Sequence, residues 1–156
     1  MSKDGGAATD GYHPTAPHPE GRGLQAALRS ALADASTDPA EISYINTHGT
    51  GTLVNDAAEA TALARFPFRE ECRMVSSKGG TGHTLGAAGA VEAIITLLAL
   101  SAGVTGGTPG CGETDSTLPV SVLPAGSTAP LFGRKGISQS LAFGGFNGAV
   151  VLEALG

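Results

Sequence analysis

Two histidines in this sequence each stand in a short segment of glycine and hydroxyl residues. His48 lies within residues 47–52, His83 directly follows residues 79–82, and a third glycine-rich segment spans residues 143–147. Glycines let a backbone approach a ligand closely, and a neutral imidazole N–H can donate to a carbonyl oxygen. The pattern therefore indicates two imidazoles that stabilise an enolate or oxyanion, with a backbone N–H of the third segment on a second oxygen.

Other chemistry is less well supported by these residues. A lone loop histidine is more often a surface or core residue than a catalyst, so the prediction depends on the matching contexts of the pair; His13 and His18 receive no function. Cys72, Cys111 and the histidines lack the spacing of metal ligands, so we expect no metal. Residues 79–82 lack the spacing of a phosphate-binding loop, and we expect no cofactor.

The longest apolar run, residues 85–100, carries a single ionisable side chain, Glu92. Such a run predicts a helix that is buried on all sides. A buried carboxylate needs a partner, and the nearest basic residue in sequence is Lys78, in the loop before the helix. We therefore predict that Lys78 pairs with Glu92 and helps to position His83. The alternative is that Glu92 emerges at the surface on a thin polar stripe.

Helices and strands alternate around these segments and predict an α/β fold with a mixed sheet. Residues 1–19, rich in glycine and proline, are predicted to form a flexible arm or a connection, and residues 20–156 a single domain. A hairpin is expected around residues 144–147, so its two strands are antiparallel. Helices are expected at 20–35, 57–65 and 85–102, and strands at 42–46, 73–76, 120–123, 136–143 and 148–155.

Asp56 has two explanations. Asn55 or Asp56 is expected to cap the helix that follows, and Asp56 with Glu59 three residues later resembles a capping box. Asp56 would otherwise brace the loop that carries His48. The cap is at least as consistent with the sequence as the brace.

Composition limits the remaining possibilities. The chain has 156 residues and a formal net charge of −5, which argues against nucleic-acid binding. Two cysteines are more typical of a reducing compartment than of a disulfide framework. The polar start predicts no signal peptide, and residues 85–100 fall short of the ~20 apolar residues of a membrane span. We expect a cytoplasmic protein that does not enter membranes.

Three motifs taken together resemble the β-ketoacyl-ACP synthases, and most closely the elongating synthases of the thiolase fold. The motifs are NTHGTGT at residues 46–52, SSKGGTGHTLGAAG at residues 76–89 and SLAFGGFN at residues 140–147. They occur in the family's order, and the resemblance extends from about residue 12 to the end of the chain. It implies the C-terminal half of a thiolase-like fold, with a mixed five-stranded sheet and a buried central helix.

The resemblance also implies a reaction, the decarboxylative Claisen condensation of malonyl-ACP with an acyl thioester. His48 and His83 would bind the malonyl thioester carbonyl, and Lys78 would sit beside His83. The Phe143 backbone N–H would complete an oxyanion hole with that of the nucleophilic cysteine, and the Phe143 ring would gate the acyl pocket. Gly144 would belong to the same oxyanion-hole and gating turn. Structural support would come from three further side chains: Glu92, Asp56 and Asn147.

Two features depart from the family pattern. Ala142 and Phe146 stand where the family usually has glycine and threonine, and both fall in the gating loop. The nucleophilic cysteine belongs to the family's N-terminal half, and neither Cys72 nor Cys111 stands in a nucleophile motif. We therefore do not expect this chain to condense acyl groups alone.

The expected partners follow from the absence of a nucleophilic cysteine in this sequence. They are acyl carrier protein with its acyl and malonyl thioesters, and an N-terminal ketosynthase half or another synthase subunit. The apolar face left by a missing half predicts a homo- or hetero-oligomer. Two other functions stay open: a non-catalytic subunit that resembles the chain-length-factor partners, and a stand-alone thioester-binding module.

Overall fold

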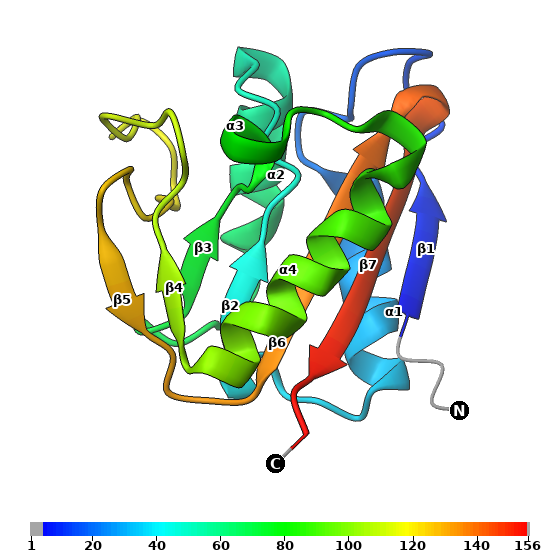
Figure 1. The fold of residues 1–156 in the computed structure, drawn as a ribbon. Coiled ribbons are helices and arrows are strands. Elements are labelled where there is room, and N and C mark those ends of the chain that lie inside the picture. The colour runs from blue at the N-terminus through cyan, green and yellow to red at the C-terminus, as the bar shows by residue number, and fades with distance from the viewer. Residues whose placement is uncertain (1–4, 156) are drawn as a thin grey trace.

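A computed structural model describes residues 5–155 of the chain (Figure 1). Helices and strands alternate along the sequence, with short 3₁₀ turns between them. In chain order the elements are β1 (Gly5–Thr9), α1 (Arg22–Asp34), η1 (Pro39–Glu41), β2 (Ile42–Asn46), α2 (Leu53–Leu63), β3 (Arg73–Val75), α3 (Lys78–Thr81), η2 (Leu85–Ala87), α4 (Ala88–Ala102), β4 (Val104–Gly106), β5 (Thr128–Pro130), β6 (Lys135–Ala142), η3 (Phe143–Gly145) and β7 (Phe146–Glu153).

Five strands form one mixed sheet in the order β1-β7-β6-β2-β3. β2 pairs in parallel with β3 and β6, whereas β7 pairs antiparallel with both β6 and β1. Helix α4 crosses one face of the sheet, and α1 and α2 lie behind the other (Figure 1). The predicted mixed five-stranded sheet and the hairpin of its last two strands are confirmed.

The core lies between α1 and the sheet. Helix α1 buries an apolar stripe, and all five residues of β2 are buried as well. On β7, Asn147, Ala149 and Val151 are buried, while Phe146 and Val150 on the alternate face are exposed. The stripe on α1 consists of Leu24, Ala27, Leu28, Ala31 and Leu32.

The prediction of a flexible arm over residues 1–19 is wrong for residues 5–9, which form β1. β1 pairs with β7 along its full length, from Gly5 opposite Val150 to Thr9 opposite Phe146. It lies so close to α1 that a Cβ on Gly6 would come within 2.1 Å of the Ala27 carbonyl oxygen. Small residues are required by this close packing, and they carry no strand signature of their own. Residues 1–4 lie outside the described residues.

Two further expectations are corrected. Residues 120–123 do not form a strand, although the Leu123 N–H donates to the Met74 carbonyl at 2.8 Å. The antiparallel pair of β4 and β5 forms at residues 104–106 and 128–130, where no strand is predicted.

Helix α4 is not buried on all sides within this chain. Its buried residues are Ala88, Glu92, Thr96 and Leu100, a stripe that contains both polar side chains of its middle turns. The apolar residues Ile94 and Leu98 point outward instead and are 58% and 64% exposed. The helix is therefore polar toward its own sheet and apolar toward the outside, the reverse of an ordinary surface helix.

Candidate active site

Strand direction brings the three predicted segments to one edge of the sheet. Because β2 is parallel to β3 and β6, the C-terminal ends of all three strands lie at the same edge (Figure 1). His48 follows β2, Lys78 follows β3, and Phe143 follows β6. Ligands of α/β sheets gather at such strand ends.

The two histidine rings meet at this edge. The ring centroids of His48 and His83 lie 5.5 Å apart, and the planes are inclined at 83°, an edge-to-face arrangement. His48 is buried, whereas His83 is exposed. The rings are close enough for their N–H groups to reach one small group placed against both.

Both rings are arranged as hydrogen-bond donors. The His83 Nδ1 accepts the Leu85 N–H at 3.2 Å, which leaves the proton of the neutral ring on Nε2. Burial, followed by the nearby charge of Lys78 and by His83, lowers the pKa of His48 from 6.5 to about 3. His48 is therefore neutral at physiological pH and can donate one N–H to an oxygen without first losing a charge.

The predicted pair of Lys78 and Glu92 is confirmed. The Lys78 Nζ bonds the Glu92 carboxylate, and the two side chains are 5% and 2% exposed. Asn46, at the end of β2, donates from Nδ2 to the Glu92 carbonyl at 3.3 Å and ties the strand to α4. A role for Lys78 in positioning His83 stays a prediction.

Glu59 braces the His48 loop, a role that the sequence analysis considered for Asp56 alone. Helix α2 begins at Leu53 with Thr52 as its N-cap, so Asp56 lies inside the helix and the predicted cap and capping box are wrong. The Glu59 carboxylate accepts the N–H of His48 at 2.5 Å and that of Gly49 at 2.9 Å.

The side chains of Asp56 and Glu59 differ in their partners. Burial raises the pKa of both carboxyls. The backbone N–H groups of Gly51 and Thr52 act in the opposite direction on the pKa of Asp56, whose buried Oδ1 has no hydrogen-bond partner within residues 5–155. Glu59 is the seventh residue of α2, nearly two turns from its start, and its side chain reaches the backbone of the preceding loop.

The third segment is held by residues that precede α1. The Gly144 N–H donates to the Pro14 carbonyl at 2.7 Å, so this amide already has an acceptor. The Gly145 carbonyl accepts the Asp10 N–H and the Asn147 Nδ2, each at 2.8 Å. Gly144 and Gly145 have φ of 79° and 75°, a backbone that strongly favours glycine.

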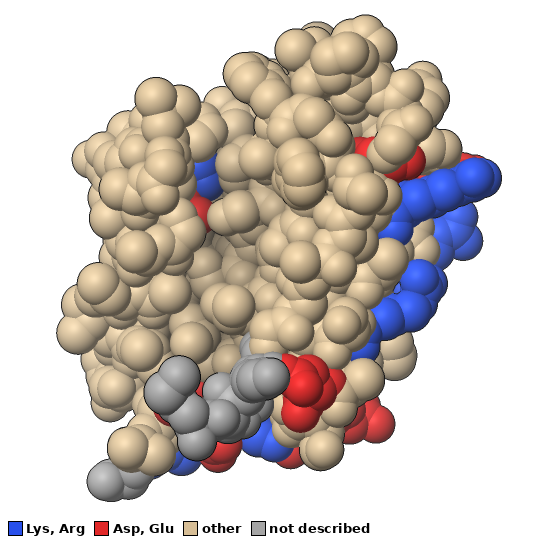
Figure 2. Space-filling model, turned by 90° about the vertical axis from the view of Figure 1, so that its right-hand side faces the viewer, with Lys and Arg blue, Asp and Glu red and all other residues tan. Residues whose placement is uncertain are grey.

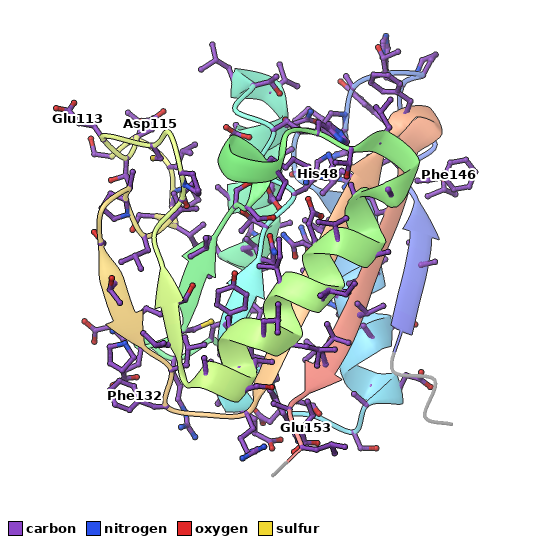
Figure 3. The ribbon with its side chains drawn as sticks, viewed as in Figure 1. His48, Glu113, Asp115, Phe132, Phe146 and Glu153 are labelled. Atoms are coloured by element: carbon purple, nitrogen blue, oxygen red, sulfur yellow. The ribbon has the colours of Figure 1, made fainter. Side chains whose placement is uncertain are left out.

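Both aromatic residues of this loop are exposed, Phe143 at 77% and Phe146 at 66%. Phe146 points away from His48, toward the outside of β7 (Figure 3). The departure from the family pattern at Phe146 therefore leaves the space beside the histidines unchanged. The Phe143 N–H stays the candidate for an oxyanion hole, because the Gly144 N–H is bonded to Pro14.

A cavity of about 570 Å³ opens beside His83, between α2, β3 and residues 108–122. Lys78 and His83 lie in its wall, together with Asp56 and Cys111. The Cys111 Sγ donates to the Glu113 carbonyl at 3.3 Å. Burial raises the pKa of Cys72 to about 12, so that thiol stays protonated and is no nucleophile.

Residues 2–111 match the family described as "Beta-ketoacyl synthase, C-terminal domain". The chain belongs to this family. It is 35% identical over 155 residues to the mitochondrial 3-oxoacyl-[acyl-carrier-protein] synthase of Arabidopsis thaliana, covering 96% of this chain and 33% of that protein. It is also 35% identical to 3-oxoacyl-[acyl-carrier-protein] synthase 2 of Vibrio harveyi, covering 96% and 37%. The chain thus spans about a third of the length of these relatives.

Solved ketosynthases share the fold. The structure of the ishigamide ketosynthase/chain length factor superposes with a TM-score of 0.88 at 36% identity, covering 97% of this chain and 37% of that one. A ketosynthase in complex with its chain length factor from Xenorhabdus doucetiae gives 0.85 at 41% identity, covering 97% and 38%. The predicted thiolase-like fold is confirmed. One relative is named mitochondrial and another chloroplastic, so a cytoplasmic location stays a prediction.

Proposed function

We propose that this chain forms the C-terminal half of a β-ketoacyl-ACP synthase, in which His48 and His83 activate malonyl-ACP for decarboxylative Claisen condensation. The observation that carries the proposal is the edge-to-face pair of the His48 and His83 imidazoles, whose ring centroids lie 5.5 Å apart. The buried ion pair of Lys78 and Glu92 accompanies it. The product would serve fatty acid, polyketide or polyene synthesis.

The histidines act on the malonyl thioester. Each donates an N–H to the thioester carbonyl oxygen, which becomes an enolate oxygen as the bond between Cα and the carboxylate breaks and CO₂ leaves. The Cα of the enolate then attacks the carbonyl of an acyl group held on a cysteine. The thiolate departs when the new carbon–carbon bond is complete, with the Phe143 N–H on the second oxyanion.

The nucleophilic cysteine comes from outside residues 1–156, as part of a longer chain or of a separate one. Its carrier would cover the apolar surface formed by α4 and the outer face of β7. Leu85, Ile94 and Leu98 on one side and Phe146 and Val150 on the other are exposed there. On the side of the molecule that carries β1, most charged side chains gather at the right-hand and lower margins. The rest of this face is uncharged except for a small blue and a small red area left of the centre (Figure 2).

A membrane is the alternative to a protein partner for covering this apolar surface. By length and composition alone, the stretch Leu85–Ala102 could cross a bilayer, and 22% of it is buried in the chain. Its polar stripe argues for a protein partner, because Glu92 is already paired with Lys78 inside the fold and α4 packs on β6 and β2.

The test is reconstitution. The chain is produced together with a cysteine-bearing N-terminal ketosynthase segment, and release of CO₂ from malonyl-ACP is measured. We expect a stable complex that decarboxylates malonyl-ACP, loss of this activity in His83→Ala with unchanged circular dichroism, and no activity of the chain alone. A His83→Ala complex as active as the wild type contradicts the proposal.

A second function is favoured by two of the structural relatives, which are described as ketosynthases with a chain length factor. In that case the chain belongs to a non-catalytic subunit that shapes the acyl pocket of a true synthase. The same experiment separates the two functions, because this subunit forms a stable complex without releasing CO₂. A monodisperse chain that binds a malonyl thioester unaided identifies the third, a stand-alone binding module.

A further inference from the structure

Packing alone does not explain Gln139, on the central strand β6. Its side chain is 1% exposed, and its Nε2 donates to the Glu59 carboxylate at 2.6 Å. Among the described residues its buried Oε1 has no partner. A leucine or methionine would fill a similar volume without burying an unpaired carbonyl oxygen, which is unfavourable. The bond to Glu59 therefore accounts for an amide at this position.

That bond completes a clamp around a buried carboxylate. Glu59 is 4% exposed and takes part in none of the salt bridges formed within residues 5–155. Its three donors are the N–H groups of His48 and Gly49, at 2.5 and 2.9 Å, and the Gln139 amide at 2.6 Å. Two of these donors belong to the loop itself, so Gln139 is the donor that links the clamp to the sheet.

The His48 ring depends on this clamp. Its Nδ1 is buried and, in the part of the chain that the structure describes, has no hydrogen-bond partner. Histidines that act on a substrate are usually oriented by a hydrogen bond to the second ring nitrogen. Here the backbone of His48 is held instead, so the position of the ring follows from the bonds at its own N–H and from the contact with His83.

We infer that Gln139 is a positioning residue for His48. It holds Glu59 on the N–H groups of His48 and Gly49 and thereby sets where the imidazole meets the substrate oxygen. The inference rests on the proposed function, because it concerns the same site.

The first test replaces Gln139 by glutamate. Two carboxyl groups at hydrogen-bond distance share one proton at low pH and repel each other once both are ionised. In Gln139→Glu the amide ¹⁵N–¹H shifts of His48 and Gly49 should match the wild type near about pH 5 and move away from it by about pH 8. The movement is measured against the wild-type profile over the same range, and Gln25→Glu, a matched change on the partly exposed face of α1, should follow that profile. Wild-type shifts throughout this range in Gln139→Glu overturn the inference.

The second test removes the bond at every pH. In Gln139→Leu the amides of His48 and Gly49 should exchange with solvent roughly tenfold faster or more, the loss expected for one hydrogen bond to a charged group. The Ile137 amide, on the same strand, should keep its wild-type rate. Equal acceleration at Ile137 means that the substitution loosens the whole sheet, and it overturns the inference, as does an unchanged rate at His48.

Neither measurement requires substrate or partner. Failure of the reconstituted complex to decarboxylate, with the amide changes present, counts against the proposed function alone. In an active complex, Gln139→Glu should lose decarboxylation as pH rises through the same range in which the amide shifts move, relative to the wild-type pH profile. An active complex in which Gln139→Glu keeps the wild-type pH profile overturns the inference.

Discussion

The two histidine segments are built in opposite ways. The His48 loop is buried, and its backbone is held by Glu59 from α2, which the sheet anchors in turn through Gln139. The His83 segment is exposed, and Leu85 beside it has φ of 52°, a conformation that costs a non-glycine residue roughly 1–2 kcal/mol. The His48 loop is supported within this chain, whereas the His83 segment lies at the surface, where a partner would contact it.

The anchors of the two segments differ as well. Hydrogen bonds to backbone amides fix the His48 loop, and none of its contacts needs a positive charge. The segment before His83 is anchored by a single buried ion pair, Lys78 with Glu92. Two experiments on the chain alone test this contrast, and a third tests the surface that a partner would cover.

The largest effect should follow removal of the buried cation. Lys78→Ala leaves the Glu92 carboxylate buried without a partner, and the free energy of unfolding should fall by about 3–5 kcal/mol in urea titrations. Lys135→Ala is the matched control, because its ion pair with Glu41 lies at the surface and should contribute little.

A double variant sharpens the result. Lys78→Met with Glu92→Leu leaves no buried charge and should recover most of the lost stability. If Lys78→Ala and Lys135→Ala destabilise the chain equally, the ion pair does not anchor the segment.

An intermediate effect should appear in the pH dependence of stability. The pKa of His48 is about 3 in the folded chain and 6.5 ordinarily, so the unfolded chain binds one more proton between these values. Stability should therefore fall as pH falls through this window, by up to about 1.4 kcal/mol for each pH unit. His48→Gln carries no such proton, and its stability should vary less over the same window. Parallel curves for the two proteins would show that His48 is not held neutral by the fold.

The smallest effect on the chain itself is expected on the outer face of α4. Leu98 is 64% exposed, so Leu98→Lys should change the free energy of unfolding by no more than about 0.5 kcal/mol. It should nevertheless weaken the complex with a cysteine-bearing segment, as measured by size-exclusion chromatography. Leu100→Lys, at a buried position of the same helix, should unfold the chain. Loss of vesicle flotation in Leu98→Lys, with complex formation intact, would point to a membrane instead.

Several features could be predicted because local chemistry allowed few alternatives. Glu92 stood alone in an apolar run, so Lys78 was the one basic residue near enough along the chain to neutralise it. Glycines between two β-rich runs predicted the hairpin that ends in β7. Matching segments after β2 and β3 predicted that His48 and His83 would meet, because parallel strands end at a common edge.

The sequence by itself thus determined the family, the mixed sheet, the meeting of the histidines and the buried ion pair. Tertiary structure alone decided three other points. β1 is a strand because β7 offers hydrogen bonds and α1 leaves room only for small side chains. The role of Glu59 in bracing the loop could not be predicted, because its bond to Gln139 joins residues 80 positions apart in the sequence. The outward apolar face of α4 depends on which side of the helix packs on the sheet. The sequence does not indicate that side, because an almost wholly apolar helix has little amphipathic pattern.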